Sequence, residues 1–379
     1  MTTPDLISGL EGVIAADTAL SSVDGLKGEL IIAGFALAEL AENASFEEAA
    51  YLLWHGELPD SEQLQTFHDK IAHRRSLPSI TLQLLEAAAA KETAPMDALR
   101  MAAATLDLDV EDELEARALS LLARFPTIVA AYHRLRQGQQ PLAPRAKLGH
   151  AANYLYLLHG VRPTPAQVRA LNTYLISVVD HGLNASTFTA RIIVSTDSDL
   201  VSAIVGAIGA LKGPKHGGAP GPALDMVFAI DRPDRAEPYL RAKLERGERL
   251  MGFGHRVYKV RDPRADVLSR AAARLYEASE QDGMTELYEL ARHVEETAVR
   301  LLDEYKPGRN LQTNVEFYTA LLLHGLNLNN DLFSPTFAIG RLPGWIAHCF
   351  EQQRRGRLIR PSSTYSGRRD RRWRPLQER

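Results

Sequence analysis

The chain has 379 residues, and its 44 basic and 47 acidic side chains leave a formal net charge of -3. This balance excludes a general attraction to nucleic acid or to an anionic membrane, so any anion site must be local. The length suits roughly two to three domains with a substantial core. No apolar run approaches the roughly 18 residues of a membrane span and no secretion signal opens the chain, so a cytoplasmic protein is expected.

The elements expected along the chain are mainly helical. The opening segment, from residues 9–14 to residues 31–35, is the best candidate for a minor β element. Beyond it, apolar residues recur at spacings of three and four, as in the stretch 287–301, whereas alternating runs are short and few. The sequence therefore predicts an all-α fold.

Two helix starts can be read from their capping residues. Ser45 and Glu48 form a capping box before an apolar run. Asp262 followed by Pro263 gives an N-cap and a first helical position. Both places are expected to begin helices.

The stretch 213–222 is rich in glycine and proline. It ends an expected helix over about 199–212 and starts another, so we expect a hinge here, with a domain boundary near residue 218. Closer to the C-terminus, the only cysteine, Cys349, lies in an apolar stretch and is expected to be buried. The basic tail 368–374 is expected to be a solvated or subunit-clasping arm rather than a phosphate site.

Three histidines stand in glycine-containing segments: His181, His216 and His255. Glycine lets a backbone approach a ligand closely, and loops carry more functional groups than helix faces. A structural histidine is the plainer interpretation of any one of them, but three together with Arg264 favour a site. They lack the close spacing of metal ligands, so no metal is expected. The Gly-Phe-Gly at 252–254 does not complete a dinucleotide-binding motif.

Arginines and one carboxylate complete the candidates. Arg264, Arg341 and Arg360 each suit a carboxylate ligand, because a planar guanidinium donates two parallel hydrogen bonds. Glu316 precedes an apolar run and is the candidate carboxylate. Taken singly, a surface arginine and a first-turn acid are the plainer interpretations. Together these groups predict acid–base chemistry on a small acid.

Seven segments, taken in order, resemble the citrate synthase family, and the shorter microbial citrate and 2-methylcitrate synthases in particular. The similarity spans about residues 9–367. It implies a mainly helical homodimer with a large domain (1–217 and 326–379), a small mobile domain (218–325) and an active site in the cleft. The segments that carry it are residues 9–13, 42–48, 180–188, 213–218, 251–259, 314–318 and 357–361.

The resemblance implies condensation of oxaloacetate with an acyl-CoA, normally acetyl-CoA or propionyl-CoA. Glu316 would then remove a proton from the acyl α-carbon, and His216 would hydrogen-bond the thioester oxygen of the developing enolate. His255 would polarise the oxaloacetate carbonyl and later protonate the alkoxide. Hydrolysis of the CoA thioester would release the product.

The resemblance also implies binding residues. Those for oxaloacetate are His181, His255, Arg264, Arg341 and, from the neighbouring subunit, Arg360. Those for CoA are Leu250, Met251, Gly252, Phe253, Gly254, Lys259 and Arg309. Coenzyme A is a substrate in this interpretation, and no cofactor or metal is implied.

Two positions depart from the family pattern. Glu316 stands where aspartate is usual, and a shift of about 1 Å in a catalytic group can cost on the order of a hundredfold in rate. Pro220, Gly221 and Pro222 replace an Asn-Glu-Ala pattern. Both changes flank the same acyl-CoA pocket, which hints at coordinated remodelling, and we expect activity to be retained.

Three alternatives remain open at this point. A 2-methylcitrate synthase is close to the preferred citrate synthase, because one methyl group discriminates by only about 1–3 kcal/mol. A catalytically weak relative that binds oxaloacetate or CoA as a regulatory module is a second alternative, motivated by Glu316 and Pro220. A helical scaffold without a ligand would require the histidines and arginines to be a coincidence.

Overall fold

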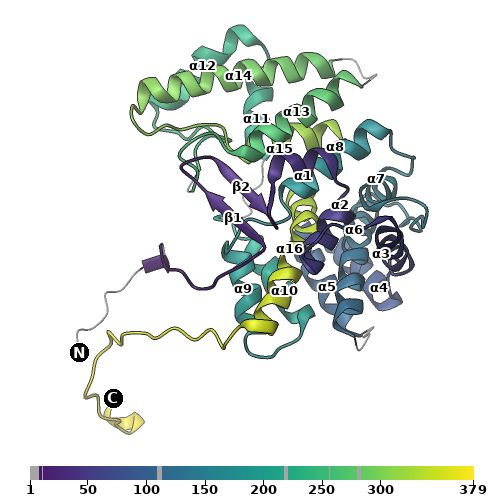
Figure 1. Cartoon of the computed structure of the whole chain (residues 1–379). Coiled ribbons are helices and arrows are strands. Elements are labelled where there is room, and N and C mark those ends of the chain that lie inside the picture. The colour runs from purple at the N-terminus through teal and green to yellow at the C-terminus, as the bar shows by residue number, and fades with distance from the viewer. Residues whose placement is uncertain (1–7, 11, 109–112, 217–220, 256, 280–282) are drawn as a thin grey trace.

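The structure is a computed structural model of the chain, and it describes residues 8–10, 12–108, 113–216, 221–255, 257–279 and 283–379. Pro220 and the domain boundary predicted near residue 218 lie outside these residues. Figure 1 shows a body of packed helices with one small sheet on its surface.

The sheet has three antiparallel strands in the order β1-β2-β3. Ser21 pairs with Ile32 across the first two strands, and Ile31 pairs with Ala36 across the next two. The predicted β element is therefore confirmed at its later end. The described residues of the range 9–14 form no strand, because Gly9 and Gly12 adopt positive φ angles of 75° and 78° that extended strands do not use. The strands are β1 (Ser21–Asp24), β2 (Glu29–Ile32) and β3 (Phe35–Ala36).

The helices of the described residues confirm the predicted all-α class. The first ten are α1 (Leu37–Asn43), α2 (Phe46–His55), α3 (Ser61–His73), α4 (Ser79–Ala90), α5 (Pro95–Thr105), α6 (Leu114–Arg136), α7 (His150–His159), α8 (Pro165–Ser177), α9 (Ala185–Val194) and α10 (Leu200–Leu211). They are followed by α11 (Gly221–Ile230), α12 (Ala236–Glu245), α13 (Pro263–Glu277), α14 (Met284–Tyr305), α15 (Val315–Gly325) and α16 (Phe333–Arg355).

Both capping predictions are confirmed. The Ser45 hydroxyl accepts from the Glu48 N–H (3.2 Å), and the Glu48 carboxylate accepts from the Ser45 N–H (2.7 Å) at the start of α2. Asp262 caps α13, and Pro263 is the first residue of that helix. An N-cap of this kind stabilises a helix by about 1 kcal/mol, so these two starts are fixed locally.

One continuous apolar core joins the helices. α16 runs through the body and packs against α9, α10, α2 and α6, while α13 packs against both α15 and α8. Cys349 on α16 is buried, as predicted, and burial raises the pKa of its thiol to about 12. The result is a rigid frame on which loops and helix starts can hold functional groups.

The first described residues and the segment after α16 both leave this body (Figure 1). The segment after α16, residues 356–379, is mostly exposed, and Trp373 in it has 79% of its surface exposed. An arm that clasps a second subunit remains a prediction. No helix of the described ranges is long and apolar enough to cross a membrane, and the cytoplasmic location also remains a prediction.

Candidate active site

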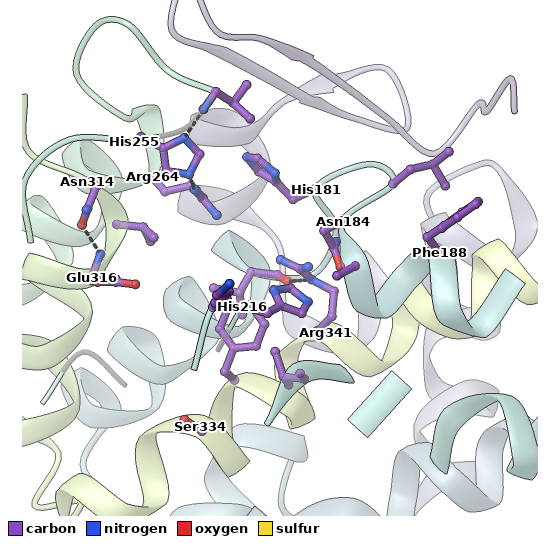
Figure 2. A pocket seen from close by; sticks show the side chains of 18 of the residues that line it. His181, Asn184, Phe188, His216, His255, Arg264, Asn314, Glu316, Ser334 and Arg341 are labelled. Carbon is purple, nitrogen blue, oxygen red and sulfur yellow. Dashed lines mark hydrogen bonds between the residues drawn. The ribbon is translucent and has the colours of Figure 1, made fainter. Parts of the chain in front are cut away.

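A cavity of about 840 Å³ brings together side chains that are far apart in the sequence. Six of the predicted site residues line it: His181, His216, His255, Arg264, Glu316 and Arg341. Figure 2 shows His255, Arg264 and Glu316 grouped on one side of the view, with His216 and Arg341 nearer the middle. The cavity therefore lies between α13 and α15 on one wall and α9 and α16 on the other.

His216 is held at the N-terminus of α9. Its Nε2 accepts the Ser186 backbone N–H (3.2 Å) and lies 2.7 Å from the Ser186 hydroxyl oxygen. That hydroxyl is fixed in turn by the Asn184 side chain (2.8 Å) and by the Trp345 indole N–H (3.1 Å). Burial lowers the pKa of His216 to about 4, and the charge of Arg341 acts in the same direction. The ring is therefore neutral at pH 7, with its proton on Nδ1.

His255 is oriented by its own loop. Its Nδ1 accepts the backbone N–H groups of Val257 and Tyr258, both at 3.1 Å. Burial, together with the nearby Arg264, lowers the pKa of His255 to about 4. The neutral ring thus carries its proton on Nε2, which lies 3.4 Å from Arg264 Nη2. Two donors meet at this point, and an acceptor oxygen of a ligand can bond to both.

Arg264 stands at the start of α13 and is already paired. The Asp262 carboxylate accepts from its backbone N–H (3.0 Å), its Nε (3.0 Å) and its Nη2 (2.7 Å). Burial by itself lowers the pKa of Arg264, but the carboxylate outweighs it and the net pKa is raised. The ion pair fixes the guanidinium plane against the cavity.

Arg341, in α16, is buried without such a partner. Its Nε donates to the Val178 carbonyl oxygen, and its guanidinium stacks 4.8 Å from the centre of the Phe337 ring. No carboxylate of the described ranges forms an ion pair with it. Burial lowers its pKa to about 10, and the charge of the nearby Asp180 carboxylate opposes this only in part. A bound anion would supply the direct ion pair that Arg341 lacks among the described residues.

Glu316 lies in the first turn of α15. The Asn314 side chain caps this helix by accepting the Glu316 N–H (2.9 Å), and its amide donates to the Gly254 carbonyl oxygen (2.9 Å). One residue thus ties the Glu316 helix to the His255 loop. Burial raises the pKa of Glu316 to about 7, and Arg264 opposes this only in part. A carboxylate with this pKa is a competent general base near neutral pH.

The predicted CoA segment runs alongside the start of α15. Gly254 N–H donates to the Gln312 carbonyl oxygen (2.7 Å), and Asn314 N–H donates to that of Gly252 (2.9 Å). Gly252 has a φ of 86°, and a Cβ there would come within 2.9 Å of the Phe317 side chain. Glycine is therefore required for this close approach.

The structure places the predicted CoA residues outside the cavity. Lys259 and Arg309 are both exposed, and the Asn310 side chain donates to the Lys259 carbonyl oxygen (2.6 Å), which joins their two loops. Arg360 is also exposed, beyond α16 and outside the cavity of its own chain. Its predicted role therefore depends on a second subunit.

Several contributing residues were not predicted. The Tyr174 side chain on α8 lines the cavity, and its buried hydroxyl has no partner within the described part of the chain. Ser21 on β1 donates to the Asp180 carboxylate (2.5 Å) and accepts the Gly182 N–H (2.9 Å), which fixes the loop that carries His181. Asp180 and Ser186 lay inside a recognised motif. Tyr174 and Ser21 had no sequence signal, because distance along the chain hides their contacts.

A helical fold whose cavity combines two neutral histidines, a carboxyl group with a raised pKa and two buried arginines is typical of an enzyme that acts on small acids. A sequence profile described as "Citrate synthase, C-terminal domain" matches residues 9–362. The chain is 41% identical over 379 residues to citrate synthase 2 of Bacillus subtilis strain 168, which covers 98% of both chains. It is 37% identical over 369 residues to 2-methylcitrate synthase of Mycobacterium tuberculosis strain H37Rv, covering 96% of this chain and 91% of the relative.

A solved structure agrees with these relatives. Citrate synthase of Thermoplasma acidophilum, in a ternary complex with carboxymethyl coenzyme A and oxaloacetate, matches with a TM-score of 0.89 at 29% identity over 100% of both chains. The chain belongs to the citrate synthase family. The expected family and fold are confirmed.

Proposed function

We propose that this protein condenses acetyl-CoA with oxaloacetate and water to give citrate and CoA, as an acyltransferase of the citrate synthase type. The observation that supports this most is that His216, His255 and Glu316 meet at one cavity with two buried arginines. The family membership supports the same reaction. Coenzyme A enters as a thioester substrate, and we propose no resident cofactor or metal.

Oxaloacetate binds on the side of the arginines in this proposal. A carboxylate of the substrate pairs with Arg341, whose buried guanidinium forms no ion pair with the described residues although Asp180 lies near it. The ketone oxygen accepts from His255 Nε2–H and lies against Arg264, the point where two donors converge. The carbonyl carbon becomes more electrophilic as a result.

The acyl-CoA binds between Glu316 and His216. Glu316, as a carboxylate, takes a proton from the acyl α-carbon, and the electron pair moves onto the thioester oxygen. His216 Nδ1–H donates to that oxygen, because Nε2 is occupied by the Ser186 N–H. A neutral imidazole at a helix N-terminus is suited to this task, since the positive end of the helix dipole disfavours protonation of the ring.

Carbon–carbon bond formation then links the two halves. The enolate carbon attacks the ketone carbon, and the oxygen receives the proton of His255 Nε2. Water cleaves the resulting thioester, which releases citrate and CoA. Glu316 releases the proton that it took from the α-carbon and His255 regains one from the medium, so the protein is unchanged after one cycle.

We also propose a homodimer that closes over its substrates. Arg360 is exposed beyond α16 and does not line the cavity of its own chain, so it would act in the cavity of a second copy, as the resemblance implies. Glu316, His255 and Arg264 belong to the proposed small domain (218–325), while His216 and Arg341 belong to the proposed large one. Movement of one domain against the other would open and close the cavity and exclude water from the enolate. Exposed Lys259 and Arg309 suit the phosphates of CoA.

A second candidate is 2-methylcitrate synthesis from propionyl-CoA. The 37% identity to the Mycobacterium tuberculosis 2-methylcitrate synthase favours keeping it. One added methyl group changes binding by only about 1–3 kcal/mol, so both substrates can be used by one site.

Free-thiol release on mixing the protein with oxaloacetate and either acetyl-CoA or propionyl-CoA tests the proposal. We expect release that requires both substrates, with citrate or 2-methylcitrate identified by mass spectrometry and kcat/KM compared side by side. Thermal stabilisation by oxaloacetate without thiol release from any acyl-CoA would instead indicate a regulatory binding protein.

A further inference from the structure

Three aromatic rings form a cluster behind the cavity. The ring centres of His181 and His255 are 6.0 Å apart, and Tyr258 lies 5.7 Å from the first and 4.9 Å from the second. Tyr258 has only 3% of its surface exposed and does not line the cavity. It therefore touches both histidines without access to a ligand.

Tyr258 bonds to both histidines, through different groups. Its backbone N–H donates to His255 Nδ1 (3.1 Å), and its hydroxyl lies 3.1 Å from His181 Nε2. A change of the side chain removes the second bond and keeps the first. The two contacts can therefore be separated by experiment.

The direction of the hydroxyl bond follows from the surroundings. Within the described part of the chain, His181 is the one hydrogen-bond partner of the Tyr258 hydroxyl. If His181 were the donor, the buried hydroxyl proton would lack an acceptor, which is costly. Burial, with Arg264, Arg341 and His255 nearby, lowers the pKa of His181 well below 6.5, so the ring is neutral. Tyr258 thus donates, and the His181 proton sits on Nδ1.

The loop that carries Tyr258 is itself fixed by the small sheet. Lys259 N–H donates to the Gly25 carbonyl oxygen (2.8 Å) at the turn between β1 and β2. A Cβ on Gly25 would lie 2.2 Å from the Val257 carbonyl oxygen, so the turn and the loop touch backbone to backbone. The Tyr258 ring is therefore held in place from behind.

We propose that Tyr258 is a positioning residue that sets the tautomer and orientation of His181 through its hydroxyl and supports His255 through its ring. The binding and catalytic roles of these two histidines rest on the proposed function. With Nε2 occupied, His181 presents Nδ1–H as its remaining donor. With its ring supported, His255 keeps Nε2–H directed toward Arg264.

The variants Tyr258→Phe and Tyr258→Leu separate the two contributions. Tyr258→Phe keeps the ring and removes the hydroxyl. It raises the oxaloacetate KM by about threefold to tenfold, the loss expected for one neutral hydrogen bond, and leaves kcat within about twofold. Tyr258→Leu removes the ring as well, and kcat falls by a further tenfold or so because His255 loses its support.

Nitrogen-15 NMR of the histidine rings gives a readout that needs no turnover. In the full-length protein labelled at histidine, the His181 signals are assigned by their loss in His181→Gln. The Nε2 resonance of wild-type His181 is that of a hydrogen-bonded, unprotonated nitrogen, and Tyr258→Phe shifts it. The matched control is Tyr132→Phe, because Tyr132 is also buried and donates to the Thr93 carbonyl oxygen at a distance from the site.

The outcomes decide the proposal separately from the function. An unchanged His181 Nε2 resonance in Tyr258→Phe overturns it, as does an equal shift in Tyr132→Phe. Unchanged oxaloacetate KM in an active Tyr258→Phe enzyme also overturns it. If the wild type releases no thiol, the proposed function fails, while the ring resonances still test the role of Tyr258.

Discussion

The two walls of the cavity hold their functional groups in different ways. On the wall of α13 and α15, Arg264 and Glu316 lie at helix starts and are held by residues close in the chain. Asp262 caps α13 and pairs with Arg264, and the Asn314 side chain caps α15 by accepting the Glu316 N–H. On the wall of α9 and α16, the contacts are distant in sequence. Trp345 of α16 donates to Ser186 of α9, which holds His216.

The walls also differ in how charge is balanced. Arg264 forms a direct ion pair with the buried Asp262 carboxylate, whereas Arg341 forms no ion pair with the described residues and only feels the charge of the nearby Asp180. On the first wall, the Asp262 carboxylate balances the charge of Arg264 before a ligand binds. The second wall leaves Arg341 without an ion pair, so the affinity for a dicarboxylate should come mainly from Arg341, and the orientation of the reacting groups from the capped helices.

Removal of the proposed base, Glu316, should have the largest effect on turnover. Glu316→Gln keeps the shape of the side chain but cannot accept the α-proton, so kcat should fall by about 10²–10⁴-fold with a nearly unchanged oxaloacetate Kd. Glu316→Asp is the matched control, since it keeps the charge and restores the usual family residue. It should fall between the wild type and Glu316→Gln. Equal kcat in wild type and Glu316→Gln would remove Glu316 from the reaction.

Methionine substitution of the two arginines should separate charge balance from binding. Arg264→Met leaves the Asp262 carboxylate buried and unpaired, which should lower the free energy of unfolding by about 3–5 kcal/mol. Arg341→Met removes a cation that forms no ion pair and one hydrogen bond, and Asp180 keeps its Ser21 and His348 partners, so this free energy should change by less than about 2 kcal/mol. Both should weaken oxaloacetate binding. Denaturant unfolding at equal protein concentration and calorimetric titration measure the two effects, and equal destabilisation would contradict the comparison.

The pH dependence of turnover should follow Glu316. Its raised pKa of about 7 means that kcat/KM rises with pH through about 7, as the carboxylate forms. His216 and His255, with pKa values lowered to about 4, stay neutral over this range and add no second step. Because burial favours the protonated carboxyl, the stability it contributes at low pH is lost as pH rises through about 7. Glu316→Gln should lack that loss, and a pH–rate profile without a step near 7 would count against the assignment.

A smaller effect is expected from Ser21 on β1, which holds the loop that carries His181. Ser21→Ala removes the bonds to Asp180 and Gly182, so the His181 loop should shift and the oxaloacetate KM should rise by about threefold to tenfold. Ser22→Ala, the neighbouring serine on β1, is the control. Steady-state kinetics compare the two variants, and equal KM values would show that the Ser21 bonds do not position this loop.

The first wall was largely predictable from the sequence, and the second was not. Asp262 and Pro263 predict the start of α13, and Asn314 precedes Glu316 in one motif. Such caps can be read locally because a capping side chain bonds a residue only two or three positions further along the chain. The role of Ser21 depends on a sheet contact with residues far along the chain, and no local pattern encodes it. The orphaned hydroxyl of Tyr174 likewise becomes visible only when α8 packs against the cavity.

Other parts need a partner before they can be placed. Arg360 is exposed in one chain, so its role as an oxaloacetate ligand depends on a second copy that the sequence only implies.

Pro220, which departs from the family pattern, lies outside the described residues and its effect stays a prediction. The sequence predicts that the β element begins near residue 9, whereas the first strand begins at Ser21. The positive φ angles at Gly9 and Gly12 are not evident from the pattern of apolar residues.

The most direct test of the account is a crystal structure with oxaloacetate and an unreactive acyl-CoA analogue. We predict one oxaloacetate carboxylate on Arg341, the ketone oxygen between His255 Nε2 and Arg264, and the acyl α-carbon beside Glu316. Oxaloacetate bound away from Arg341, or an acyl group that reaches neither Glu316 nor His216, would contradict the central claim that both walls act on one pair of substrates.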